Sequence, residues 1–254
     1  HRHRRVELRR LRPRVRSGAG VFERELRVLE AVAKGMEGEA ILLLTLTEAG
    51  QLLTVEIARN RQLYLQRFAR GVPLGPLEKV GAAPNRRGTT VAFVPDPEIF
   101  ADATFDAEVL AAAIRRFAYL SPGVTWRFQG QDVSKPDGLL TFLTDTADGT
   151  LEPGSIGVFA AELDDVKSSF AIALRQQPRP KKVGAITSWV NLSPTPEGGS
   201  HVRGMLAGLT NAFGKSWRRL EPRLVGALHL MLTHPKFEGP TKARLAVPMT
   251  NPVV

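Results

Sequence analysis

The sequence contains no cysteine, and this absence excludes disulfides, thiolate zinc sites and a cysteine nucleophile. It also lacks any apolar run of the roughly 18–20 residues that a membrane-spanning helix needs. The longest candidate, residues 40–47, is only as long as a strand. A chain without cysteine suits a reducing compartment, and we expect a cytoplasmic protein. Hydrophobic residues fill 43% of the 254 positions, which is enough for one large domain or two ordinary ones.

Positive charge is concentrated at the start of the chain. The formal net charge is +10, but the first sixteen residues hold eight arginines and one glutamate, so the remainder is nearly neutral. Two interpretations of this Arg-rich tail, residues 1–20, stay open. It is an arm that neutralises nucleic-acid phosphates, or a stretch translated from outside the natural reading frame. We expect the tail to be disordered in either case.

The hydrophobic pattern predicts an α+β fold in two domains, residues 21–130 and 131–254. The first is expected to hold helices at 21–34 and 105–120, strands at 41–47, 52–58, 62–69, 89–95 and 124–130, and a Pro- and Gly-rich loop at 71–88. The second is expected to hold a short helix at 138–146, strands at 155–163, 168–176, 185–193 and 223–234, a helix from 201, and a loop with the start of a short helix at 235–245.

Few residues form a recognisable chemical pattern. The sequence has no HExxH, GxSxG or GxxxxGK[ST] motif, and its five histidines are scattered, so we identify no catalytic residue and expect no metal site. Residues 197–201 (EGGSH) open a helix, and their backbone N–H groups could receive an anion. The same residues could equally form a tight turn with Ser200 as N-cap. Lys242 follows a buried strand, where a cation could reach a phosphate or simply be solvated.

Four segments, taken in order, resemble one family. They are residues 88–100 (GTTVAFVPDPEIF), 105–128, 189–213 (WVNLSPTPEGGSHVRGMLAGLTNAF) and 234–245 (HPKFEGPTKARL). Together they look like the ATPase half of the bacterial type IIA DNA topoisomerases, the gyrase B or topoisomerase IV ATPase subunit. The resemblance covers about residues 51–254 and is weakest at 131–184.

This resemblance implies a fold and two site residues. Residues 21–130 would be the remainder of a GHKL (Bergerat) ATPase domain, and residues 131–254 a transducer domain like the second domain of ribosomal protein S5. ATP and Mg²⁺ would be the cofactors. Thr89 matches the family threonine that helps to hold the adenine, and Lys242 matches the lysine that reaches the γ-phosphate. The family's Gln-Thr-Lys loop reads Pro240-Thr241-Lys242 here, so the amide contact of the glutamine is lost.

The family's catalytic groups have no counterpart in residues 1–50. We find there no match for the catalytic Glu, the magnesium-binding Asn or the Gly-rich lid, and phosphoryl transfer depends on such groups. We therefore expect a truncated or degenerate ATPase and transducer portion, which does not hydrolyse ATP by itself. In the family, this portion couples ATP binding to DNA strand passage. The implied partners are DNA, a topoisomerase A-type subunit and a second copy of the chain.

A second hypothesis is a non-enzymatic nucleic-acid-binding or interaction protein. It would use the Arg-rich tail and the S5-like module, with four cations facing a DNA segment: Arg175, Arg179, Lys181 and Lys182. Phosphate contacts of this kind release counterions and weaken steeply with salt. The alternative for these four residues is the solvated edge of a hairpin.

Overall fold

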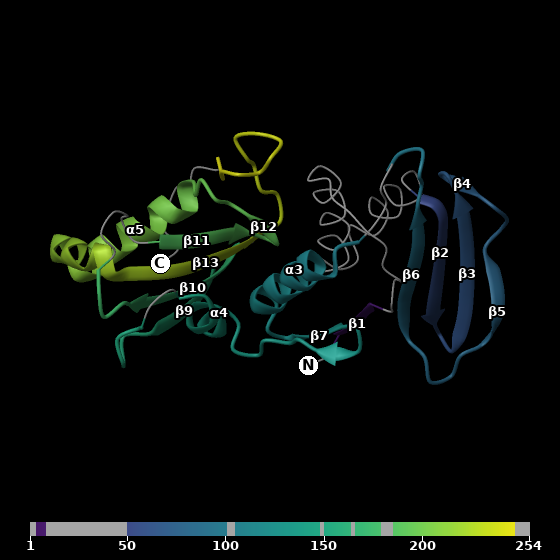
Figure 1. The fold of residues 1–254 in the computed structure, drawn as a ribbon, viewed down its shortest axis with the longest axis horizontal. Helices are drawn as coiled ribbons and strands as arrows, with labels where there is room; N and C mark the ends of the chain where they lie inside the picture. Colours follow the sequence, from purple (N-terminus) through teal and green to yellow (C-terminus); the bar gives the residue numbers. More distant parts are fainter. Residues whose placement is uncertain are drawn as a thin grey trace. The chain divides into compact units, whose positions relative to one another are not determined.

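The computed structural model describes residues 4–8, 50–100, 105–147, 150–163, 166–178 and 185–246 (Figure 1). The chain divides into two compact units. The N-terminal unit holds residues 6–114 and 127–131, and the C-terminal unit holds residues 1–5, 115–126 and 132–254. Both contain helix and strand, so the predicted α+β class is confirmed. The expected domain boundary between residues 130 and 131 stays a prediction.

An antiparallel sheet forms the N-terminal unit. Its strands follow the order β4-β3-β2-β6, and β5 pairs with β3. Their bounds are β2 Gly50–Arg59, β3 Gln62–Ala69, β4 Val72–Pro73, β5 Glu78–Ala82 and β6 Gly88–Pro95. Alternation along β2 buries Leu53 and Val55 on one face. The turn from β2 to β3 has two residues, Asn60 and Arg61, both with positive φ, which matches the right-handed twist of a hairpin.

The expected loop at 71–88 is partly wrong, because β4 and β5 lie within it. Both strands pair with β3 through the backbone. The side chains of β5 are exposed apart from Gly81, which is half-buried, so the strand carries no alternating apolar signal. Pro73 is tolerated at this place because an edge strand of two residues needs few backbone donors.

One helix and a small sheet span the division between the units. The helix is α3, Ala107–Leu120, and the sheet has the order β1-β7-β8. These strands are β1 Arg4–Leu8, β7 Val124–Phe128 and β8 Gln131–Asp132. Asp106 caps α3, since its Oδ1 accepts hydrogen bonds from the N–H groups of Glu108 and Val109 at 2.8 and 3.3 Å. The predicted helix over 105–120 and strand over 124–130 are thereby confirmed.

A five-stranded sheet forms the centre of the C-terminal unit, in the order β12-β11-β13-β10-β9. Its strands are β9 Gly157–Leu163, β10 Val166–Leu174, β11 Ala185–Val190, β12 Ser193–Pro194 and β13 Leu224–Leu232. Besides the end of α3, the described residues of this unit include the helices α4 Leu139–Thr146 and α5 Ser200–Phe213 and the 3₁₀ helix η1 Lys215–Arg223. β13 pairs antiparallel with β10 and parallel with β11, so α5 lies in the crossover between two parallel neighbours.

The two faces of this sheet carry different helices (Figure 1). Side chains of β10 and β13 alternate, so Phe170, Leu228 and Leu230 join a core with Met205 of α5. On the other face, the Trp189 ring meets Phe142 of α4 edge-to-face, with the ring centroids 4.9 Å apart. Met205 and Leu209 of α5 are buried, whereas Phe213 is 62% exposed at the end of the helix.

Two expected elements, the helix at 21–34 and the strand at 41–47, lie outside the described residues. Within the described parts of the chain, no helix is both long enough and apolar enough to cross a membrane. The 3₁₀ helix η1 was not predicted. Its sequence is polar apart from Trp217 and Leu220, so no apolar periodicity marks it.

Candidate functional site

Lys242 lies at the tip of a hairpin that follows β13. The N–H of Ala246 donates to the carbonyl of Lys236 at 2.9 Å, and the N–H of Glu238 donates to the carbonyl of Arg244 at 3.1 Å. At the tip, the N–H of Lys242 donates to the carbonyl of Gly239 at 3.2 Å. The prediction of a short helix within 235–245 is therefore wrong. The backbone groups of this segment bond across the hairpin and its turn, so they do not form a helix.

The Lys242 side chain is available to an anion. Its backbone φ of 58° is in the left-handed region, which a lysine rarely adopts, so the turn holds this residue in one conformation. Its Nζ lies 5.9 Å from the centroid of the Phe237 ring. The neighbouring cation, Arg244, pairs with Glu238 at 3.1 Å, whereas no described carboxylate forms an ion pair with Lys242. The ammonium charge is thus not neutralised by the described residues.

The hairpin is hydrogen-bonded to the glycine turn that opens α5. The N–H of Glu197 donates to the carbonyl of Ala243 at 3.0 Å, and the N–H of Leu245 donates to the carbonyl of Gly198 at 3.1 Å. The N–H of Ser200 completes this ladder by donating to the carbonyl of Leu245 at 3.2 Å. The structure therefore joins residues 197–201 and Lys242, which the sequence offered only as separate features.

The start of α5 differs from both expectations for residues 197–201. Gly199 is the N-cap, with a φ of 136°, and no side chain caps the helix. Ser200 is the first helical residue, so the prediction of Ser200 as N-cap is wrong. Its N–H already donates to Leu245, and this leaves less room for an anion at the helix start.

A buried polar chain underlies the glycine turn, and sequence reasoning missed it. His201 Nε2 lies 3.1 Å from Thr195 Oγ1, which in turn lies 2.7 Å from Ser188 Oγ of β11. All three residues are at most 3% exposed. Ser188 Oγ also donates to the carbonyl of Thr195, so each hydroxyl proton is used when Nε2 carries the imidazole proton. Burial lowers the pKa of His201 to about 4, and the ring is neutral at pH 7.

Thr89 lies on β6 in the N-terminal unit. It is exposed, and its Cα pairs with that of Ile57 on β2. Beside it, Arg86 donates to Thr90 Oγ1 at 3.2 Å and pairs with Glu56 at 2.6 Å. The Glu56 carboxylate lies opposite Thr90, so it is on the other face of the sheet from the Thr89 side chain. The role of Thr89 in binding adenine stays a prediction.

The four proposed DNA-contacting cations are not equivalent. Arg175 is only 4% exposed, and its backbone pairs with Arg223 next to the start of β13. Arg223 also pairs with Glu152. A buried guanidinium cannot meet a phosphate without rearrangement, so the burial argues against a role for Arg175 in DNA contact. The other three, Arg179, Lys181 and Lys182, lie outside the described residues.

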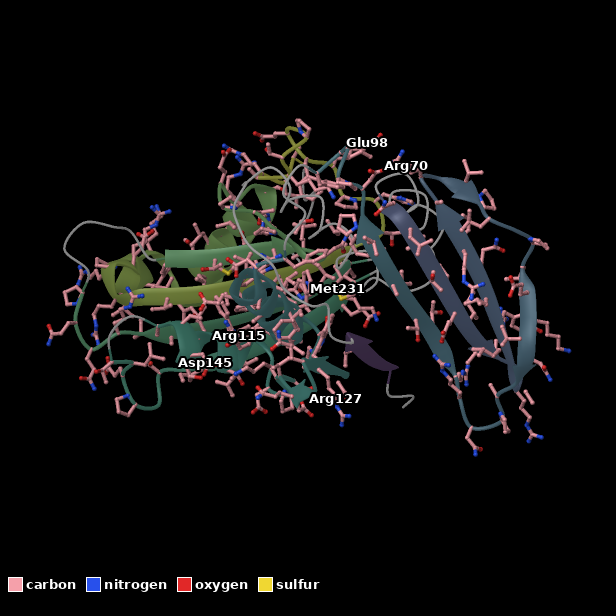
Figure 2. The ribbon with its side chains drawn as sticks, turned by 45° about the vertical axis from the view of Figure 1, so that its right-hand side comes forward. Arg70, Glu98, Arg115, Arg127, Asp145 and Met231 are labelled. Atoms are coloured by element: carbon pink, nitrogen blue, oxygen red, sulfur yellow. The ribbon has the colours of Figure 1, made fainter. Side chains whose placement is uncertain are left out.

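Each unit contains a cluster of ion pairs. In the N-terminal unit, Arg70 pairs with the buried Asp96 at 2.6 Å and with Glu98 at 2.7 Å, and Figure 2 shows Arg70 and Glu98 side by side. The hydrogen bond to Glu98 is the main reason that the pKa of Arg70 is raised. These contacts fix the residues that follow β3 and β6, so we assign the cluster a structural role.

In the C-terminal unit, Asp145 of α4 accepts hydrogen bonds from Lys135 and Tyr119, each at 2.7 Å. The bond from Lys135, and then that from Tyr119, lowers the pKa of Asp145. Burial, followed by the bond to Asp145, raises the pKa of Tyr119. The cluster ties the end of α3 to α4. No three histidine, aspartate or glutamate side chains come together as a metal site among the described residues.

Comparison with known proteins finds relatives among the B subunits of DNA gyrase and of DNA topoisomerase 4. No protein-family model matches the sequence. The chain is 28% identical over 244 residues to DNA gyrase B of Campylobacter jejuni, a match covering 88% of this chain and 31% of that protein. It is 31% identical over 213 residues to the B-type subunit of DNA topoisomerase 4 from Pseudomonas aeruginosa, covering 76% of this chain and 34% of that protein. The chain thus spans about one third of the curated relatives that it matches.

A solved structure of a gyrase B ATPase domain has a similar fold. The 43K ATPase domain of gyrase B from Thermus thermophilus, crystallised with an aminocoumarin, superposes with a TM-score of 0.70 at 23% identity. The match covers 85% of this chain and 64% of the crystallised one. The described architecture is therefore the fold of a gyrase B ATPase region.

Proposed function

Because the chain is homologous to about one third of the B-type subunits of DNA gyrase and topoisomerase IV, we propose that it is an ATPase and transducer portion of a type IIA topoisomerase. The observation that supports this function best is that Lys242, which pairs with no described carboxylate, lies on a hairpin bonded to the start of α5. In this proposal, ATP with Mg²⁺ is the ligand, Thr89 helps to hold the adenine, and Lys242 contacts the terminal phosphate. The C-terminal unit is the S5-like transducer.

The proposed role of Lys242 is to distinguish ATP from its product. A lysine is a compact charge on a flexible stem, and charge-assisted contacts to phosphate oxygens are stronger than neutral hydrogen bonds. Lys242 would gain its partner only when a third phosphate is present, so ATP would favour one arrangement of the hairpin over another. In the intact protein, this shift would be coupled to DNA strand passage with a topoisomerase A-type partner. Hydrolysis would need groups beyond those that we identify in this chain.

DNA is the second proposed ligand, and one described feature supports it. η1 places three exposed cations, Lys215, Arg218 and Arg219, within five residues, and none of them forms an ion pair with a described carboxylate. Trp217 anchors this segment by donating from Nε1 to Thr210 Oγ1 at 2.9 Å. A fixed row of unpaired cations is suited to a phosphate backbone. Arg179, Lys181 and Lys182 are proposed as further DNA contacts of the same domain.

The test of the ATP proposal is calorimetric binding of ADP and of a non-hydrolysable ATP analogue, each with Mg²⁺. We expect the analogue to bind more tightly than ADP. Lys242→Ala should reduce that preference by at least about tenfold, since charged hydrogen bonds contribute roughly 1.5–3 kcal/mol. Lys236→Ala is the matched control, because it removes an exposed lysine from the base of the same hairpin. Absence of saturable binding, or equal loss in both variants, would refute the role of Lys242. Magnesium-dependent turnover would refute the claim that the chain does not hydrolyse ATP alone.

A further inference from the structure

The backbone ladder between the hairpin and the glycine turn requires a glycine at position 199. A Cβ on Gly199 would lie 2.4 Å from the carbonyl oxygen of Leu245 and 2.6 Å from its nitrogen. Both are backbone atoms and cannot rotate away as a side chain can. The φ of 136° at Gly199 is also one that other residues rarely adopt. Any side chain at this position must therefore displace the strand that leads from Lys242.

Leu245 fixes the other side of this contact. It is fully buried, and it packs in the core cluster with Met205 of α5 and Leu230 of β13. Its N–H and carbonyl both bond to the glycine turn. Only two residues separate Leu245 from Lys242, so the chain has little length over which the lysine could move independently. The tip of the hairpin and the start of α5 are thus held to each other through one buried residue.

The glycine turn is in turn fixed to the sheet. Thr195 is 1% exposed, and its N–H donates to the carbonyl of Ser188 at 2.8 Å, while its own carbonyl accepts from the N–H of Gly198 at 2.8 Å. The hydroxyl of Thr195 bonds to His201 of α5 and to Ser188 of β11. These bonds tie the turn to β11 and to α5, so the turn cannot follow a displaced hairpin without breaking them. A displacement must either break the ladder or move α5 with it.

From these contacts we propose that Gly199 is a positioning residue for Lys242, and that the hairpin and the start of α5 respond to the terminal phosphate as one body. This inference rests on the proposed function, because it assumes that Lys242 meets that phosphate. Gly199 itself touches no ligand. It acts by letting the backbone of residues 243–245 lie against the turn at 197–200. Phosphate contact at Lys242 would then change the environment of α5 and, through Thr195, of β11.

The first test compares Gly199→Ala with Gly204→Ala. Gly204 lies inside α5 with nothing within 4 Å of the position of a Cβ, so alanine there is expected to be tolerated. We expect Gly199→Ala to lose about tenfold in affinity for the ATP analogue and to keep its affinity for ADP. A purely structural lesion would weaken both ligands. Gly204→Ala should behave like the wild type.

The outcomes separate this inference from the proposed function. If Lys242→Ala leaves the preference for the analogue intact, the proposed function fails. If Lys242→Ala removes that preference and Gly199→Ala keeps it, only the positioning role of Gly199 fails. Equal loss of both ligands in Gly199→Ala would also overturn the positioning role.

The second test needs no substitution, and it applies even if Gly199→Ala does not fold. Hydrogen exchange of the wild-type chain is measured at the three ladder amides, those of Glu197, Ser200 and Leu245. We expect the ATP analogue to slow exchange at all three together, and ADP to have no such effect. If calorimetry has established the Lys242 contact and exchange slows at none of the three amides, the inference is overturned.

Discussion

Acidification from pH 7 to pH 5 is expected to destabilise the C-terminal unit by about 4 kcal/mol. Two of its histidines, His201 and His229, are at most 5% exposed. Burial lowers the pKa of each to about 4. Because an unfolded imidazole has a pKa of about 6.5, the unfolded chain binds protons that the folded chain does not. Stability is therefore fully present above about pH 6.5 and is lost as the pH falls toward 4.

The size of this effect follows from the two protonation curves. At pH 5, about 97% of unfolded imidazoles carry the proton, against about 10% of a buried ring with a pKa near 4. The difference amounts to about 2 kcal/mol for each histidine, relative to pH 7. Neither ring has a described acidic partner that would offset the cost. His229 donates from Nε2 to the carbonyl of Asn191, and His201 bonds to the hydroxyl of Thr195.

Urea unfolding followed by tryptophan fluorescence measures this effect directly. All three tryptophans, at positions 126, 189 and 217, belong to the C-terminal unit, so their signal reports on its unfolding. We expect His201→Gln and His229→Gln each to remove about half of the pH dependence. His234→Gln, at an exposed position, should leave it unchanged. Equal stability of the wild type at pH 7 and pH 5 would refute the assignment of two neutral buried rings.

Two further results are expected. Replacing Lys215, Arg218 and Arg219 together by alanine should flatten the dependence of log affinity for duplex DNA on log salt by about 2–3 units, since each phosphate contact contributes about 0.9; an unchanged slope would exclude η1 from the interface. Leu245→Ala should cost about 3 kcal/mol of unfolding free energy, because it opens a cavity in a fully buried position. Leu220→Ala, at a 42% exposed position, should cost less than about 1 kcal/mol in the same urea titration and is the control.

The regular elements of the fold could be predicted because their apolar residues repeat with the period of a helix or a strand. α3 follows from the spacing of Ile114, Phe117 and Leu120, all of which are buried. β13 follows from a continuous apolar run that the sheet buries on both faces. β5 could not be predicted, because its side chains are mostly exposed and only backbone bonds place it.

The candidate site could be predicted only in pieces. Lys242 and the Gly198-Gly199 pair stand out in the sequence, but no local pattern indicates that segments more than forty residues apart share a ladder. The buried chain of Ser188, Thr195 and His201 combines three ordinary polar residues from a strand, a loop and a helix. Each is unremarkable until tertiary packing removes the water around it.

The parallel pairing of β11 with β13 has a consequence for how the C-terminal unit folds. Ala185 lies opposite Val225, so forty residues must be closed into a loop before this pair of strands can form. The β9–β10 hairpin closes a far shorter loop and can form early, as a local template. The ladder between residues 197–200 and 243–245 depends on α5 and β13 being in place first. The segment that carries Lys242 is thus expected to be the last part of the unit to acquire its structure.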